Sequence, residues 1–212
     1  MPRGVRRIVL VLAAVVASLA AAAAVAAPPA VDAEAYLVVN GQTGEVLASR
    51  NAAERVPMAS ITKLMTVLVA LEHARPDDVV TVGAGAASVG ESTINLRAGE
   101  RLTVGDLVTA ALVQSANDAA TALAAGVADG SVERFVGWMN EKAAALGLHE
   151  THFVNPSGLD APGHVSSARD LTRLARIAMR NPIVRDGQRD GARRDDDLAQ
   201  RPVDADDPRR RS

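Results

Sequence analysis

The last 28 residues of the chain, 185–212, limit where a folded domain can lie. They contain eight arginines and eight aspartates, but only one leucine and one valine. Such a segment cannot bury enough apolar surface to offset the conformational entropy that it would lose on ordering. We therefore predict a disordered Arg/Asp-rich tail over 185–212. The residues before it are numerous enough to form one domain with a hydrophobic core.

The N-terminal segment has the pattern of a leader. Three of the first seven residues are arginines, and an uncharged apolar run over 8–26 follows and ends in Ala-Val-Ala. A basic segment, an apolar segment and a small-x-small site are typical of a secretory signal peptide. We predict a signal peptide over 1–26, a linker over 27–34 and an exported, extracytoplasmic protein. The alternative is an uncleaved anchor that keeps the chain in contact with the membrane.

The composition excludes several classes of function. The formal net charge of −2 provides no broad basic field for nucleic acid. The chain has no cysteine, which excludes disulfides, zinc-thiolate sites and a cysteine nucleophile. Its four histidines do not have the spacing of a metal site. We expect neither a metal nor a cofactor.

The hydrophobic pattern between these ends predicts a β-hairpin followed by helices. Two strand-like runs, 35–40 and 45–50, flank the turn sequence Gly-Gln-Thr-Gly. Thr103 and Asp106 match a variant of the helix-capping box. Apolar residues at helical spacing, with proline or glycine near several ends, predict the helices. The predicted helices span 61–74, 103–114, 117–128, 131–148 and 166–180, with a short strand at 79–83 and a loop at 151–160.

The first predicted helix carries an unusual lysine. Lys63 is one of only two lysines among 23 cationic residues, and it follows Ser60 by three positions, which places both on one helix face. At a helix start, unpaired backbone N–H groups can stabilise an oxyanion. A desolvated lysine can act as a base near neutral pH, whereas arginine cannot. The pattern indicates a nucleophile and its base. The alternative is a capping serine and a solvated lysine.

A second polar motif lies between two of the predicted helices. The triplet Ser115-Ala116-Asn117 can project a hydroxyl and an amide into a cleft. By itself the triplet favours a helix–helix turn in which Asn117 is the N-cap. Ser60 and Lys63 lie about 55 residues upstream, and the two motifs together favour a functional site.

Several stretches, in this order along the chain, resemble the serine D-alanyl-D-alanine carboxypeptidases, the low-molecular-mass penicillin-binding proteins. The resemblance covers 35–184 and implies a partial transpeptidase-like domain. The implied fold class is α+β, as in β-lactamases and DD-peptidases: a helical cluster with an N-terminal β-hairpin. The matching stretches are ASITKLMT (59–66), SANDAA (115–120), FVGWMNEKAAALGL (135–148), THFVNPSGLD (151–160) and GHVSSARDLTRLA (163–175).

The resemblance also implies a role for each site residue. Ser60 would form an acyl-enzyme, and Lys63 would be its general base. Ser115 would relay a proton to the leaving group, and Asn117 would hold the substrate backbone. The substrate would be the pentapeptide stem of peptidoglycan, which loses its terminal D-Ala. β-Lactam antibiotics would act as inhibitors that acylate Ser60.

The chain departs from the family in one motif. The family carries a Lys-Thr/Ser-Gly triplet on a cleft-lining strand, and the 212 residues contain no such triplet. Most of the central antiparallel sheet is also not recognisable. We interpret the chain as a truncated or frameshifted member and expect it to be inactive. The alternatives are a non-catalytic remnant that binds penicillin or peptidoglycan and, less favoured by the matching stretches, a serine β-lactamase.

Overall fold

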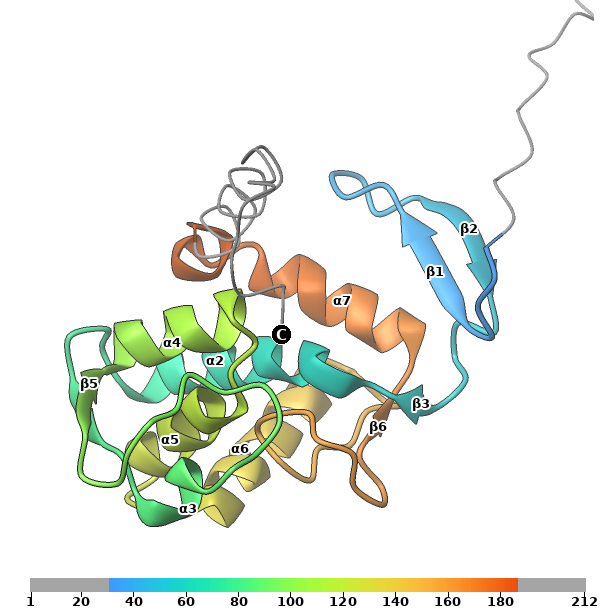
Figure 1. The fold of residues 1–212 in the computed structure, drawn as a ribbon. Coiled ribbons are helices and arrows are strands. Elements are labelled where there is room, and N and C mark those ends of the chain that lie inside the picture. Colours follow the sequence, from blue (N-terminus) through green and yellow to red (C-terminus); the bar gives the residue numbers. More distant parts are fainter. Residues whose placement is uncertain (1–30, 187–212) are drawn as a thin grey trace, which may run out of the picture. The chain divides into compact units, whose positions relative to one another are not determined.

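A computed structural model describes residues 31–186 of the chain (Figure 1). The chain divides into the units Met1–Ala33 and Glu34–Ser212, and the architecture below belongs to the second unit. The predicted signal peptide over 1–26, much of the predicted linker over 27–34 and nearly all of the predicted tail over 185–212 lie outside the described residues.

The N-terminal hairpin is present as predicted. Strands β1 (Tyr36–Val39) and β2 (Val46–Arg50) pair antiparallel, with a register irregularity between Val38 and Val39. The connecting turn is set by Asn40, whose Oδ1 accepts hydrogen bonds from the backbone N–H groups of the residues two and three positions later. This is the usual way in which asparagine stabilises a turn.

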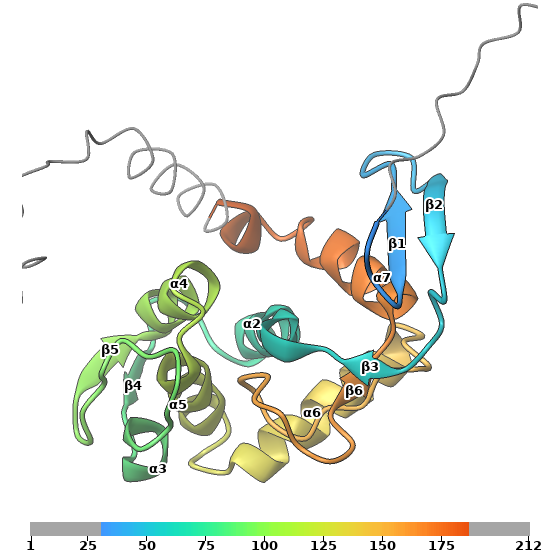
Figure 2. The ribbon, with the colours of Figure 1, turned by 45° about the vertical axis from the view of Figure 1, so that its right-hand side comes forward.

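The helices pack around one central helix. Helix α2 (Thr62–His73) contacts four others, and Figure 2 shows it surrounded by them. Helix α7 (Ala168–Ala178) also contacts β1 of the hairpin. The surrounding helices are α4 (Val104–Val113), α5 (Asn117–Val127), α6 (Val132–Ala145) and α7 (Ala168–Ala178).

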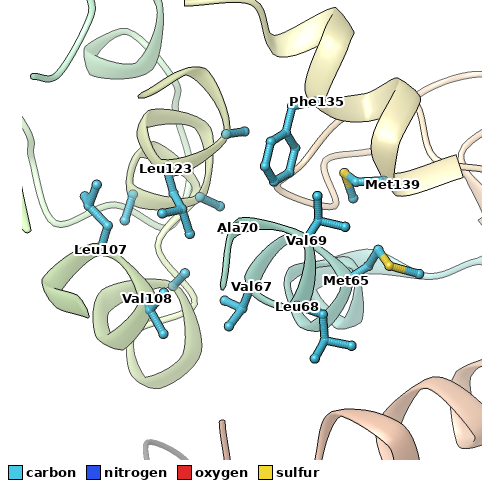
Figure 3. Close-up of a cluster of buried hydrophobic side chains, with 14 of the residues drawn as sticks. Met65, Val67, Leu68, Val69, Ala70, Leu107, Val108, Leu123, Phe135 and Met139 are labelled. Carbon is cyan, nitrogen blue, oxygen red and sulfur yellow. The ribbon is translucent and has the colours of Figure 1, made fainter. Parts of the chain in front are cut away.

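The core lies on several sides of α2 because that helix is apolar around most of its circumference. Met65, Val67 and Val69 are each at most 1% exposed. In Figure 3, Val67 points toward α4, whereas Val69 points toward Phe135 and Met139 of α6. Burial of each such side chain contributes roughly 1.5–3 kcal/mol. Helix α2 is therefore firmly held in place.

The helix ends follow the capping residues of the sequence. Thr103 and Asp106 form the predicted capping box of α4: the Asp106 N–H donates to Thr103 Oγ1 at 3.1 Å, and the Thr103 N–H donates to Asp106 Oδ2 at 3.3 Å. Ser131 and Ser167 cap α6 and α7 with a single side-chain hydrogen bond each, which their hydroxyls accept from the N–H groups of Arg134 and Asp170. Beyond the end of α6, Gly147 takes the left-handed conformation, with φ +65°.

One of the short elements was predicted from the sequence, and the others were not. The predicted strand at 79–83 forms as β4 (Val79–Thr81), but its partner β5 (Arg101–Thr103) was missed. A second pair joins β3 (Val56–Pro57) to β6 (Val165–Ser166). The short helices η1 (Ala59–Ile61) and α3 (Ala84–Ala87) were also unexpected. Within residues 31–186, each sheet has two strands, and no helix has the length and apolar character needed to cross a membrane.

Candidate active site

Ser60 and Lys63 meet at the junction of η1 and α2. Ser60 is exposed in η1, and Lys63 lies in the first turn of α2, only 2% exposed. The Lys63 Nζ lies 3.1 Å from Ser60 Oγ. The three-residue spacing therefore brings the two side chains together, as predicted. Ser60 occupies a 3-10 turn immediately before the α-helix, and not the first turn of the α-helix itself.

Two further oxygens hold the Lys63 side chain. Its Nζ donates to Asn117 Oδ1 at 2.8 Å and to the backbone carbonyl of Ser157 at 2.6 Å. An ammonium group has three N–H donors, whereas a neutral amine has two donors and one lone pair. The two carbonyl oxygens can accept only N–H donors. In the neutral amine, the lone pair is therefore left to face Ser60.

Burial sets the acidity of this ammonium group. Desolvation lowers the pKa of Lys63 from 10.5 to about 8, and the negative charge of Glu91 opposes part of that shift. A substantial fraction of Lys63 is therefore neutral at mildly alkaline pH. The neutral amine can accept the proton of a serine hydroxyl.

Asn117 links Lys63 to a neighbouring loop. It is the first residue of α5 and is 4% exposed. Its Nδ2 donates to the Gly90 carbonyl at 3.1 Å, and its backbone N–H donates to the Ser92 carbonyl at 2.7 Å. The alternative prediction that Asn117 caps this helix is wrong, because Ala116 occupies the N-cap position without a side-chain cap. The amide oxygen is directed to Lys63.

Ser115 lies in the turn between α4 and α5, with a left-handed φ of +54°. It lines a hollow of about 400 Å³ together with Ser60, Lys63 and residues of α7. Within residues 31–186, its hydroxyl makes no hydrogen bond to Ser60 or Lys63. The structure therefore brings Ser115 to the same hollow, and its role as a proton relay stays a prediction.

The loop at 155–158 supplies contacts that the sequence analysis missed. Asn155 is a turn-former, because its Oδ1 accepts from the N–H groups of Ser157 at 3.1 Å and Gly158 at 2.7 Å. This turn presents the Ser157 carbonyl to Lys63. It also places Gly158, at φ +91°, so close to η1 that a Cβ atom there would lie 2.1 Å from the Ala59 carbonyl oxygen. The Asn-Pro-Ser-Gly sequence is the one signal for this turn.

The chain is similar to known proteins over this region. A family model described as D-alanyl-D-alanine carboxypeptidase matches residues 21–187. The D-alanyl-D-alanine carboxypeptidase DacD of Salmonella typhimurium is 44% identical over 160 residues, which are 70% of this chain and 41% of that protein. A D-alanyl-D-alanine endopeptidase of Pseudomonas aeruginosa is 41% identical over 150 residues, which are 70% of this chain and 48% of that protein.

The chain is also similar in fold to a solved structure. The D-alanyl-D-alanine carboxypeptidase of Mycobacterium tuberculosis is 35% identical, with a TM-score of 0.70 over 76% of this chain and 61% of that chain. The chain spans less than half the length of the two curated relatives, 41% and 48%.

Proposed function

The chain belongs to the D-alanyl-D-alanine carboxypeptidase family, and we propose that Ser60 is the nucleophile of a serine-type reaction of this family. Ser60 Oγ attacks the carbonyl between the two terminal D-alanines of a peptidoglycan stem peptide. The peptide bond breaks, the terminal D-Ala leaves, and the remaining stem is held as an ester on Ser60. Water then hydrolyses the ester and restores the serine.

The observation that carries this proposal is the 3.1 Å contact between Lys63 Nζ and Ser60 Oγ. Lys63 takes the hydroxyl proton as Oγ attacks, because its other two N–H donors are held by Asn117 and the Ser157 carbonyl. Ser115 passes a proton to the leaving amine from its place in the same hollow. Asn117 holds the backbone of the bound peptide.

The same chemistry predicts inhibition by β-lactams. A β-lactam presents a strained amide, and attack by Ser60 would open the ring and leave a slowly hydrolysed ester. The proposed setting is the extracytoplasmic side of the cell envelope, with residues 1–26 as the export signal and membrane contact if that segment stays uncleaved. Binding of penicillin or peptidoglycan without turnover is the alternative for these 212 residues.

Covalent labelling tests the proposal. We expect prolonged incubation with a fluorescent penicillin to give one adduct, which peptide mapping places on Ser60. Ser60→Ala should abolish that adduct. Ser49→Ala is the matched control, because Ser49 is exposed on β2 and is not a hydrogen-bond partner of Lys63. Labelling that persists in Ser60→Ala, or that never forms in the unaltered chain, would contradict the proposed nucleophile.

A further inference from the structure

A buried histidine joins the loop at 151–164 to the start of α2. His164 is 3% exposed, and its ring is hydrogen-bonded on both sides. The backbone N–H of Val154 donates to Nδ1 at 3.0 Å, and Nε2 lies 2.8 Å from Thr62 Oγ1. Because Nδ1 is an acceptor here, the neutral ring must carry its proton on Nε2 and donate to Thr62.

We propose that His164 is a positioning residue for the Ser60–Lys63 pair, and that its neutral Nε2–H tautomer fastens the 151–164 loop to α2. A second proton would sit on Nδ1. It would then face the N–H of Val154, and two donors cannot share a hydrogen bond. Protonation therefore breaks the link between the ring and its own loop, while Nε2–H can still donate to Thr62.

The loop that His164 fastens is the one that holds Lys63. The Ser157 carbonyl accepts from Lys63 Nζ at 2.6 Å. One helical turn further along α2, Thr66 Oγ1 donates to the Pro156 carbonyl at 2.7 Å. A loop released at Val154 would hold the Ser157 carbonyl less firmly and admit water beside Lys63. The consequence for acylation rests on the proposed function, whereas the change at Lys63 does not.

The surroundings of His164 favour the neutral ring. Burial lowers its pKa below 6.5, the charge of Asp160 raises it in part, and His152 lowers it further. The facing turn of α2 contributes Lys63, and the neighbouring strand β3 contributes no titratable group. Because the folded-state pKa lies below the unfolded value, this stabilisation is present above pH 6.5 and is lost as pH falls through the folded pKa.

Nuclear magnetic resonance on the unaltered 212-residue chain tests the tautomer. Two-bond ¹H–¹⁵N spectra should show Nε2–H for His164 at about pH 8, with a titration midpoint below 6.5. The Nδ1–H tautomer, or a midpoint at or above 6.5, would overturn the proposal. This NMR measurement requires no variant and no enzymatic activity.

Two substitutions test whether His164 positions Lys63. His164→Gln keeps one donor and one acceptor but cannot titrate, whereas His164→Ala removes both. The Lys63 Cε titration is readable because the chain has only two lysines. We expect its midpoint near 8 in the unaltered chain and in His164→Gln, and a rise toward 10.5 in His164→Ala. If the midpoint of the Lys63 titration is the same in His164→Ala and in the unaltered chain, His164 does not position Lys63.

The pH dependence of stability provides a further test of the proposal. From about pH 8 to about pH 5, the unaltered chain should lose more stability than His164→Gln. His149→Gln, at an exposed position near the same loop, is the matched control and should follow the unaltered chain. If the unaltered chain and His164→Gln lose the same stability on acidification, protonation of His164 does not release the 151–164 loop. Failure of penicillin labelling would count against the proposed function and would leave the results on the His164 tautomer, the Lys63 titration and acid unfolding unaffected.

Discussion

Lys63 is at most 2% exposed, yet it is not neutralised by a carboxylate contact. Its three partners are a hydroxyl, an amide oxygen and a backbone carbonyl, none of which carries a full charge. Such partners satisfy the N–H donors without the strong Coulombic attraction that would hold the proton. Desolvation by burial therefore lowers the pKa of Lys63 to about 8, although the charge of Glu91 opposes part of the shift, and this pKa suits a general base.

Lys63→Arg is expected to be nearly as damaging to acylation as Lys63→Ala. Arginine keeps the charge, but its guanidinium cannot accept a proton, and its planar fork does not fit three acceptors around one nitrogen. Both variants should lower the penicillin acylation rate on the order of 10²-fold or more.

Lys142→Arg is the matched control for this experiment. Lys142 pairs with Glu72 on the surface, so its replacement should leave the rate unchanged. A Lys63→Arg variant that keeps the acylation rate of the unaltered chain would show that Lys63 is not the base.

The sequence predicts some site residues better than others for a physical reason. Ser60 and Lys63 are three positions apart, and a helix brings such neighbours together wherever it forms. The third Lys63 partner is the backbone carbonyl of Ser157, and every residue type has that group. The pairing of Thr62 with His164 joins residues 102 positions apart, which only the tertiary fold brings together.

Among the structural elements, the loop at 155–158 depends most on backbone conformation. Gly158 lies at φ +91°, a region that side chains rarely adopt, and it packs directly on the Ala59 carbonyl before Ser60. The close approach fixes the position of η1 relative to this loop. The loop and the nucleophile turn therefore form one packed unit.

Gly158→Ala should destabilise the protein more than Gly99→Ala. Both glycines have a left-handed φ, but Gly99 has nothing within 4 Å of an added Cβ. We expect Gly99→Ala to cost about 1–2 kcal/mol from the backbone conformation alone. Gly158→Ala should cost about 1–3 kcal/mol more from overpacking. Urea unfolding measures both, and equal losses would mean that the contact with Ala59 is relieved without cost.

Helices were easier to predict than the small sheets. Helices α4, α6 and α7 begin beside Thr103, Ser131 and Ser167, whose side chains accept the capping hydrogen bonds. Strands β3 and β6 have two residues each, too few to show alternation, and Pro57 argues against a strand. Their pairing depends on a contact between distant parts of the chain, which local patterns do not record.

For the whole molecule, the DD-peptidase-like α+β fold is confirmed by the solved relative at a TM-score of 0.70. The predicted helical cluster and N-terminal hairpin are both present. The order of several matching stretches made the family predictable, because a single Ser-x-x-Lys motif occurs often by chance. Export and the disorder of residues 187–212 stay predictions, since those residues lie outside the described part of the chain. The predicted start of the tail is wrong, because residues 185 and 186 are helical.

The 212 residues alone should release D-Ala slowly from a Lys-D-Ala-D-Ala peptide. They contain no Lys-Thr/Ser-Gly triplet, whose strand is expected to supply an oxyanion donor and a carboxylate contact. One oxyanion donor contributes about 10²–10³ in rate. A chimaera that continues after residue 184 with the corresponding part of the Salmonella relative should be faster by at least about 10²-fold. Similar rates in the two proteins would show that the triplet is dispensable.

The pH dependence of acylation tests whether Lys63 activates Ser60. The rate constant for penicillin adduct formation on Ser60 is measured by intact mass and peptide mapping across the range around the Lys63 pKa of about 8. Protonated Lys63 cannot take the serine proton, so the rate should rise with pH and level off above about 8. A rate that stays flat or falls through this range, with the adduct still on Ser60, would contradict Lys63 as the base.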